Sequence, residues 1–241
     1  MTVRKIRLKI KKSTFRRLRR NLPPPRDILL VAMGIMLAFI GIRLSHMFDH
    51  APKPLRDNGG ITISWLPDTV KRWQQPLEAA GKKYNIDPNL LAIIMTMESG
   101  GNPKAHSGSN AQGLMQVTPP TAEDIAHKFL KKAQPQYDLY DGNTSIEFGA
   151  AYLAYLRDTF GSARQGPDWN STVELIAAGY NGGPGAASSV EKGEGLHDMQ
   201  TVAYSRDAYN MWRERNAGES PTFQRWSDRG GSHLIDTAKS N

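Results

Sequence analysis

The stretch ESGGNP at residues 98–103, followed by GLMQ at residues 113–116, decides how this chain is interpreted. Apolar residues crowd the positions before it, and the glycines and proline within it predict that a helix ends at Glu98. A carboxyl group at the C-terminal end of a helix faces the negative end of the helix dipole, which raises its pKa. A carboxyl group that keeps its proton near neutral pH is what a general acid requires.

The helix that leads to Glu98 is predicted to be buried on nearly all sides. Asp87 followed by Pro88 provides an N-cap with proline at the first helical position. The apolar residues that follow are Leu90, Leu91, Ile93, Ile94, Met95 and Met97. Because few polar positions remain, this helix is expected to lie in the core and to carry the candidate acid on it.

The rest of residues 66–216 has mostly helical periodicity, and no stretch alternates with period two. The predicted helices are one that ends near Asn85, one from Thr118 to about Lys132, a long one capped by Asn143 and ending at Gly161, one over residues 172–179, and one over residues 199–216. The segment YNGGPG at residues 180–185 is predicted to be a turn that lies close to a ligand. The fold class is therefore all-α.

The charge of the chain is concentrated at its N-terminus. Net charge is +8, but residues 1–26 contain 11 Lys or Arg and no acid, so the remainder carries 20 basic and 23 acidic residues, or −3. The high pI of 9.7 therefore belongs to the tail at residues 1–27 and does not indicate a nucleic-acid partner. The tail is better explained by membrane orientation and attraction to anionic lipid.

Residues 28–48 are predicted to form a single transmembrane helix. They are apolar apart from Arg43 and two polar interruptions, and about 20 residues suffice to cross a bilayer. The basic flank predicts a cytoplasmic N-terminus and an exported domain at the inner membrane. A cleaved signal peptide is the alternative, but no A-x-A pattern follows the apolar core.

Two flanking segments lack a sustained apolar pattern. Residues 49–65 contain prolines and glycines and are predicted to be a linker, and residues 217–241 are predicted to be a loosely held polar tail. The chain contains no Cys, so the exported part must be stabilised by packing without disulfides.

Four motifs together resemble the catalytic domain of the soluble lytic murein transglycosylase (SLT) family, which has the goose-type lysozyme fold. They are ESGGNP with Ala105 and Ser107, AQGLMQVTPPTA from Ala111, Asn143 before Gly149 and Tyr152-Leu153, and AAGYNGGPG from Ala177. Each motif alone is weakly specific, but their order and separations agree with the family over about residues 72–212.

The resemblance implies roles for particular residues. Glu98 would be the catalytic acid and base, Ser107, Met115 and Gln116 would line the sugar groove, and Tyr180 and Asn181 would face Glu98. A Tyr hydroxyl could orient the carboxyl group. The alternative is a purely structural role. In that case Ser107, Gln116 and Asn181 form hydrogen bonds with backbone groups of the loops, and Met115 and Tyr180 belong to the core.

The resemblance also implies a mechanism with one carboxylate, whereas most glycosidases use two. The N-acetyl group of the substrate would assist, Glu98 would take the proton of the sugar 6-hydroxyl, and a 1,6-anhydromuramyl end would form without metal or cofactor. Three positions depart from the family pattern: Gly101 stands where the family often has an aromatic or larger apolar residue, Gly179 interrupts an alanine-rich run, and Gln200 replaces Glu in the closing E-T-x-x-Y segment.

The expected function is thus a membrane-anchored peptidoglycan lytic transglycosylase that acts on glycan strands, with an envelope or secretion complex as a possible partner. A lysozyme-like muramidase that hydrolyses the same bond with a loop acid is one alternative. A non-catalytic module that binds the cell wall through the same groove is the other.

Overall fold

The structure is a computed structural model that describes residues 60–131, 136–161 and 169–240. All of these belong to one compact unit, Pro52–Asn241, and the other unit is Met1–Ala51. The predicted basic tail at residues 1–27 and the predicted transmembrane helix at residues 28–48 lie outside the described residues. Among the residues that are described, no helix is both long enough and apolar enough to cross a bilayer.

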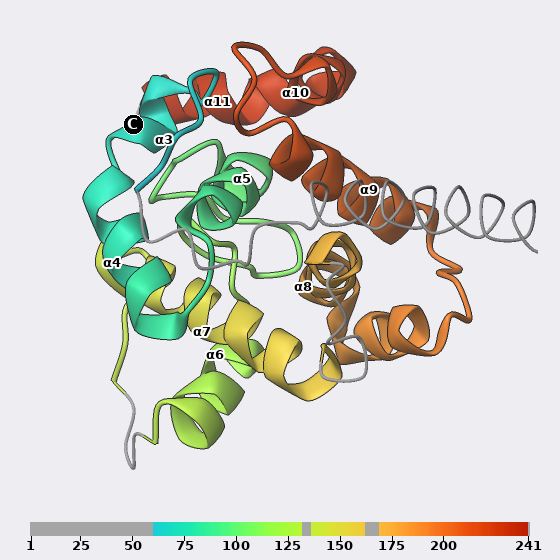
Figure 1. The fold of residues 1–241 in the computed structure, drawn as a ribbon. Coiled ribbons are helices and arrows are strands. Elements are labelled where there is room, and N and C mark those ends of the chain that lie inside the picture. Colours follow the sequence, from blue (N-terminus) through green and yellow to red (C-terminus); the bar gives the residue numbers. More distant parts are fainter. Residues whose placement is uncertain (1–59, 132–135, 162–168, 241) are drawn as a thin grey trace, which may run out of the picture. The chain divides into compact units, whose positions relative to one another are not determined.

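The described residues are mainly helical, as predicted (Figure 1). Residues 105–117 form a loop with isolated bridges between His106, Gln112 and Val117, and the described ranges contain no strand. The helices are α3 (Asp68–Lys71), α4 (Gln74–Tyr84), α5 (Pro88–Ser99), α6 (Pro119–Asp124), the π-helix η1 (Ile125–Phe129), α7 (Gly142–Phe160), α8 (Trp169–Lys192), α9 (Met199–Arg213), α10 (Pro221–Trp226), the π-helix η3 (Ser227–Gly231) and α11 (Ser232–Lys239).

Helix α5 is the central element of this unit. It packs against α3, α4, α9 and α11, and every residue of it except Glu98 is buried. The predicted cap is confirmed, because the Asp87 carboxylate accepts a hydrogen bond from the Asn89 N–H at 2.9 Å. Gly100 takes a left-handed conformation directly after the helix. The apolar sequence of α5 thus places Glu98 at the end of a core helix, as expected.

Two predicted helix boundaries need correction. The long helix α7 is capped by Asp141 instead of Asn143, because the Asp141 carboxylate accepts the Thr144 N–H at 2.8 Å and the helix begins at Gly142. The helix after Thr118 is shorter than predicted: α6 ends at Asp124 and continues as one π-helical turn to Phe129. The predicted end of α7 at Gly161 is confirmed.

The predicted turn at residues 180–185 is partly wrong, because the helix continues through Tyr180 and Asn181. The break in α8 comes at Gly183, whose backbone has φ 79° and ψ 177°. Pro184 explains this position, since proline disfavours the helical conformation at the residue before it, and glycine adopts positive φ without strain. Tyr180 and Asn181 therefore project from a helix.

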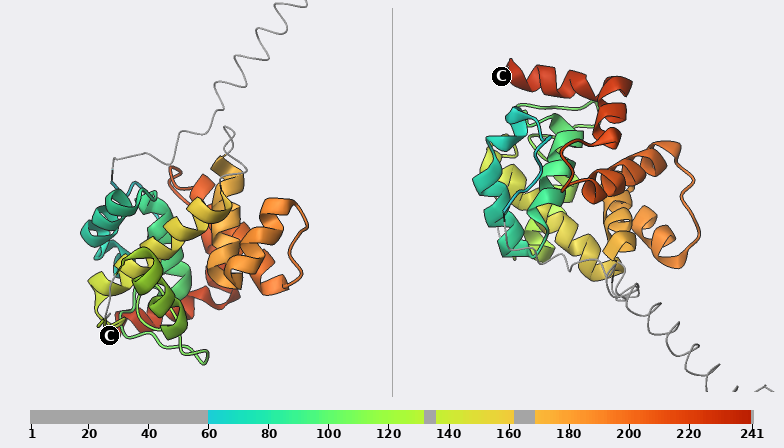
Figure 2. Two further views of the ribbon diagram at one scale, coloured as in Figure 1. Left: turned by 90° about the horizontal axis from the view of Figure 1, so that it is seen from below. Right: turned by 45° about the horizontal axis from the view of Figure 1, so that its top comes forward.

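The prediction of a loosely held tail at residues 217–241 is wrong for most of that segment. Ser220 caps α10 by accepting the Phe223 N–H at 2.9 Å. Helix α11 packs against α3 and α5 (Figure 2). Its residues Ile235 and Ala238 are buried. The apolar residues are too widely spaced to give a clear period, but they bury their side chains once the other helices provide a surface.

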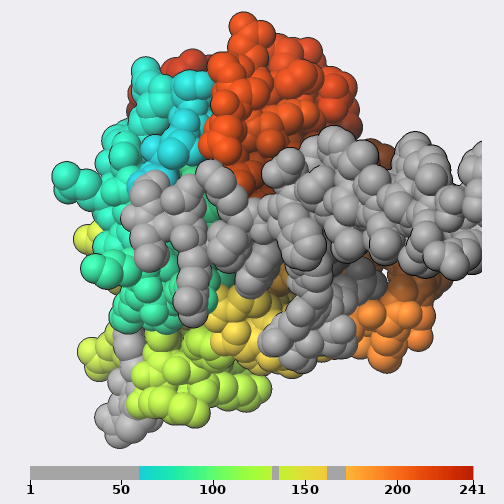
Figure 3. Space-filling model, viewed as in Figure 1, coloured from blue at the N-terminus to red at the C-terminus, as the bar shows by residue number. Residues whose placement is uncertain are grey.

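The end of the predicted linker at residues 49–65 also belongs to the folded unit. The Thr62 N–H donates to Asn89 Oδ1 at 2.8 Å, and Ile63 is buried. The Ser64 hydroxyl donates to the Ala217 carbonyl at 3.2 Å. In Figure 3 the segment that begins at residue 60 (blue) accordingly lies beside the C-terminal part (orange-red).

Candidate active site

Glu98 lies at the C-terminal end of α5, and unlike its neighbours on this helix it is partly exposed to solvent. The Tyr204 hydroxyl, from α9, donates a hydrogen bond of 2.6 Å to Glu98 Oε1. Burial of the carboxyl group raises the pKa of Glu98 to about 7, and the hydrogen bond from Tyr204 acts in the opposite direction. A raised pKa was predicted from the helix end, but the principal physical cause is desolvation.

Tyr180 lies near Glu98 without binding it. Its hydroxyl donates instead to the backbone carbonyl of Met115, at 2.7 Å. Burial, followed by the negative charge of Glu98, raises the pKa of both Tyr180 and Tyr204 well above the usual value. Both tyrosines are therefore protonated near neutral pH and act only as hydrogen-bond donors or acceptors, not as bases.

Ser107 and Gln116 stabilise the loop at residues 105–117. The Gln116 side-chain N–H groups donate to the carbonyls of Ala105 at 3.1 Å and Gly113 at 2.9 Å. Ser107 Oγ accepts the Ala111 N–H at 3.0 Å. Both side chains thus have the loop-supporting role that was weighed against groove lining. Both are also partly exposed, and the Gln116 amide oxygen makes no hydrogen bond within the described residues.

Met115 was expected to line the sugar groove, but it is fully buried. Its side chain fills the space beside Gly149, where a Cβ would come within 2.8 Å of three Met115 atoms. Its backbone N–H donates a hydrogen bond to Ser145 Oγ at 3.1 Å. Met115 is therefore a core residue whose carbonyl positions Tyr180, and it has no surface with which to line a groove.

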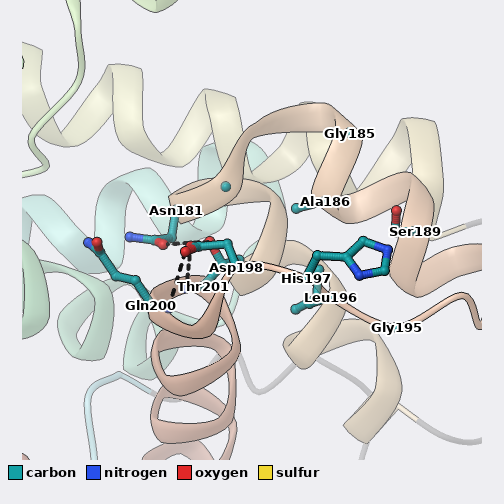
Figure 4. A pocket seen from close by; sticks show the side chains of 11 residues that line it. Asn181, Gly185, Ala186, Ser189, Gly195, Leu196, His197, Asp198, Gln200 and Thr201 are labelled. Atoms are coloured by element: carbon teal, nitrogen blue, oxygen red, sulfur yellow. Dashed lines mark hydrogen bonds between the residues drawn. The ribbon is translucent and has the colours of Figure 1, made fainter.

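Asn181 lines a cavity of about 400 Å³ between α8 and the start of α9 (Figure 4). Its Oδ1 accepts a hydrogen bond from the Thr201 hydroxyl at 3.0 Å, and Thr201 is bonded in turn to the α9 cap Asp198. No hydrogen bond joins Asn181 to Glu98 within the described part of the chain. Gln200 lines the same cavity and is exposed.

The other two departures from the family pattern have a packing explanation. A Cβ at Gly101 would lie 2.3 Å from the Thr69 carbonyl oxygen of α3. A Cβ at Gly179 would lie 2.8 Å from the Leu156 side chain and 2.9 Å from that of Ala187. In this chain, neighbouring segments already occupy the space that larger residues would need.

Tyr204 was not identified as a site residue from the sequence. The signal was present, because Tyr204 is the last residue of the segment QTVAY at residues 200–204, which was compared with the family's closing motif. Tyr204 matches the tyrosine of that motif, whereas Gln200 departs from its glutamate. The structure shows that the hydroxyl expected to orient Glu98 comes from Tyr204.

A muramidase would need a second carboxylate, but Glu123, Asp124, Asp138, Asp141 and Glu147 form no hydrogen bond with Glu98 in the described structure. Asp138 and Asp141 accept hydrogen bonds from nearby backbone N–H groups. Glu123 and Asp124 pair with His127 and Lys128 on the same helical segment, and Glu147 bonds Lys83 and Tyr84. Across the described ranges, no group of three or more His, Asp or Glu side chains could hold a metal ion.

Comparison with solved structures gives only loose similarity. Lytic transglycosylase Slt of Pseudomonas aeruginosa, as an inactive mutant, matches with TM-score 0.46 and 24% identity over 61% of this chain and 25% of that one. The 70 kDa soluble lytic transglycosylase of Escherichia coli matches with TM-score 0.44 and 27% identity over 63% and 27%. These scores are too low to establish a common fold.

Sequence comparison is more informative. A membrane-bound lytic murein transglycosylase E of Buchnera aphidicola is 32% identical over 54% of this chain and 60% of its own length. A membrane-bound lytic murein transglycosylase C of Yersinia enterocolitica is 32% identical over 75% and 55%, so the match spans little more than half of either relative. The model of the transglycosylase SLT domain matches residues 75–202, which include Glu98, Tyr180 and Asn181. The chain belongs to the transglycosylase SLT domain family.

Proposed function

We propose that the chain is a peptidoglycan lytic transglycosylase that cleaves the β-1,4 bond between N-acetylmuramic acid and N-acetylglucosamine. The observation that carries this proposal is the Glu98 carboxyl group, which burial holds at a pKa of about 7 and which Tyr204 orients. Such a group can donate a proton and accept one within a single reaction near neutral pH. The relatives named as lytic murein transglycosylases support the choice of substrate.

In the proposed mechanism, protonated Glu98 gives its proton to the glycosidic oxygen, and the bond from that oxygen to C1 of the muramic acid breaks. The carbonyl oxygen of the sugar's own N-acetyl group bonds to C1 and takes the place of a protein nucleophile. The Glu98 carboxylate then removes the proton of the 6-hydroxyl, and O6 displaces the N-acetyl oxygen from C1. A 1,6-anhydro ring forms, and Glu98 regains its proton.

Tyr204 has a defined part in this cycle. A hydrogen bond to the charged form of a carboxyl group stabilises that form. Once Glu98 has given up its proton, the Tyr204 hydroxyl remains as a donor to the carboxylate at 2.6 Å and keeps it aimed at the reacting sugar. Tyr204 thus supports the step in which Glu98 acts as a base.

Substrate binding in this proposal uses Ser107, Gln116, Tyr180 and Asn181, all of which are partly exposed. The free amide oxygen of Gln116 can accept a hydrogen bond from a sugar hydroxyl or N–H group, and the side-chain N–H groups of Asn181 can donate to a sugar oxygen. Met115 is left out because it is buried. Its contribution is the carbonyl that fixes Tyr180.

The proposal includes attachment to the inner membrane by residues 28–48, with the N-terminus cytoplasmic and the catalytic unit outside the cytoplasm. The apolar sequence, its basic flank and the "membrane-bound" names of two relatives support it. Fractionation checks attachment: the full chain should stay with membranes after an alkaline wash, and protease added to spheroplasts should degrade the unit that contains Glu98.

Product analysis tests the activity. The full chain is incubated with purified murein, and the products are examined by mass spectrometry. Anhydro ends, each one water lighter than a reducing end, are expected, and Glu98→Gln should form none. Reducing ends formed by addition of water would indicate a muramidase instead. Binding to murein without any bond cleavage would indicate a non-catalytic wall-binding module.

A further inference from the structure

The C-terminal helices α10, η3 and α11 take no part in the mechanism above, but they contact both helices that carry the Glu98–Tyr204 hydrogen bond. Helix α11 packs against α5, which carries Glu98, and α10 packs against α9, which carries Tyr204 (Figure 1). All three helices lie outside residues 75–202, which the model of the SLT domain matches. Membership of the family therefore does not explain their presence.

Helix α11 lies directly against the turn that follows Glu98. Gly100 ends α5 in a left-handed conformation, with φ 61°. A Cβ at this position would lie 2.6 Å from the backbone N of Ile235 and 2.7 Å from the carbonyl oxygen of Leu234, both in α11. Only glycine permits so close an approach. Since no side chain separates the two backbones, a movement of α11 would displace the end of α5.

A second element holds the same turn. The Arg72 guanidinium and the Trp73 indole N–H both donate to the Gly101 carbonyl, at 2.8 Å and 3.2 Å. These residues follow α3, which also packs against α11. The end of α5 is thus held by two neighbouring segments, and Glu98 has little freedom to follow a partner that moves away.

The C-terminal helices also hold α9 close to Tyr204. Asp207 lies three residues after Tyr204, which is slightly less than one helical turn. Its side chain is only 10% exposed, and its carboxylate accepts a hydrogen bond from the guanidinium of Arg229 in η3. A carboxylate so far removed from water needs such a partner. Directly after α9, the Glu214 carboxylate accepts the N–H of Thr222 in α10 at 3.0 Å.

The Glu98–Tyr204 hydrogen bond depends on the separation of α5 and α9, because hydrogen bonds weaken outside a narrow range of distance and angle. We propose that Arg229 is a positioning residue for the reaction: by holding Asp207, it keeps α9 at the separation from α5 at which Tyr204 bonds Glu98. The inference rests on the proposed function for the reaction that it affects. The effect of Arg229 passes through Tyr204 and needs no contact with the substrate.

Two variants of the full chain separate positioning from a direct effect of charge. Arg229→Met removes a cation and Asp207→Leu removes an anion, so by charge alone they would shift the pKa of Glu98 in opposite directions. Loss of positioning weakens the bond from Tyr204 in both variants and raises the pKa of Glu98 in both. The alkaline limb of the pH–rate profile on murein should therefore move to higher pH in both. In both, kcat should fall by about 2- to 30-fold with KM unchanged.

The pH profile reports Glu98 because the titratable groups that face it in the described structure are Tyr204 from α9 and Tyr180 from α8. Both keep their protons near neutral pH. In a Tyr204→Phe background, Arg229→Met should cause no further shift, since the bond that it supports is already absent. Asp236→Asn is the matched control: this exposed acid of α11 pairs with Lys239, and its loss should leave kcat and the pH profile unchanged.

The Arg229 side chain is 53% exposed, so Arg229→Met should fold, and its melting temperature checks this. Shifts of opposite sign in the two variants, an unchanged alkaline limb, or an equal further shift in the Tyr204→Phe background would overturn the positioning role. If the wild-type chain formed no anhydro ends, the proposed function would fail instead. Titration of the Glu98 carboxyl group by NMR in the same variants would then still decide whether Arg229 positions Tyr204.

Discussion

The Tyr204 hydroxyl donates a hydrogen bond of 2.6 Å to Glu98 Oε1, and so joins the end of α5 to α9 across 106 residues of sequence. Burial and this hydrogen bond shift the pKa of the carboxyl group in opposite directions. Burial favours the protonated form and the hydrogen bond favours the charged form, with a net pKa of about 7. The charge state of Glu98 therefore depends on a residue from another helix.

Tyr204→Phe should lower kcat by about 10- to 100-fold, which is below the contribution of a whole general acid or base. The pKa of Glu98 should rise, because the lost hydrogen bond stabilised the charged form. The alkaline limb of the pH–rate profile should move to higher pH. Steady-state rates on murein across a pH series measure both effects.

Tyr209→Phe is the matched control for that variant, since Tyr209 is also on α9 but its ring pairs with Arg213 and not with Glu98. It should leave kcat and the pH profile unchanged. An unaltered pH profile in Tyr204→Phe would contradict the role assigned to the hydroxyl, even if the rate fell.

The rate of the wild-type chain should decrease as pH rises through about 7. The first step needs a proton on Glu98, and the protonated fraction falls tenfold for each pH unit above the pKa of about 7. The dependence of kcat/KM on pH reports the free enzyme. A rate that stays constant to about pH 9 would contradict Glu98 as the general acid.

The folded state should lose stability as pH rises from about 4.5 to about 7. The folded-state pKa of Glu98 is raised to about 7 from 4.5, so in this window the folded chain binds more protons than the unfolded chain. The free energy of unfolding should fall by up to about 3 kcal/mol across it and not change further above pH 7.

Glu98→Gln cannot ionise, so it should lack that loss and should be more stable than wild type at alkaline pH. Urea unfolding of both chains at several pH values measures the difference. Parallel pH dependence in the two chains would show that another group causes the loss.

Met115→Ala should destabilise the fold by about 2–5 kcal/mol, because the side chain is fully buried and its removal leaves a cavity beside Gly149. Met115→Leu, which nearly conserves volume, should cost less than about 1.5 kcal/mol. Thermal unfolding measures both. A raised KM with unchanged stability in Met115→Ala would restore the groove-lining role that burial argues against.

Gln200→Ala should change the free energy of unfolding by less than about 0.5 kcal/mol. It should also change the rate on murein by less than about twofold. Gln200 is exposed, and its side chain makes no hydrogen bond within the described ranges. Removal of the Gln200 side chain therefore breaks no hydrogen bond among the described residues. A larger fall in rate, checked against Tyr209→Phe, would show that Gln200 contacts the substrate.

Local signals predicted the elements that position Glu98. The cap at Asp87 and the left-handed Asn85 at the end of α4 both involve residues within one helical turn of each other, so the sequence shows them directly. The same reasoning misplaced the cap of α7, because Asn143 and Asp141 are both acceptable caps. The bond from the Thr144 N–H selects Asp141.

Features that depend on distant partners were not predictable in this way. Helix α11 was interpreted as a tail because its sparse apolar residues, such as Ile235, need the surface of α3 and α5 to become buried. Tyr180 lies near Glu98, but the partner of its hydroxyl is the Met115 carbonyl, from a different segment of the chain. Each outcome depends on how helices pack, which no local pattern records.

The sequence by itself determined that an apolar helix ends in a glycine-flanked carboxylate and that the chain carries the motifs of its family. Helix caps and apolar periodicity involve residues that are close together in the sequence, so the sequence alone is enough to predict them. Only the tertiary structure decided that burial raises the pKa of Glu98, that Tyr204 orients it, and that Met115 belongs to the core. Desolvation and hydrogen bonding depend on atoms brought together from helices far apart in sequence, and packing alone fixes their positions.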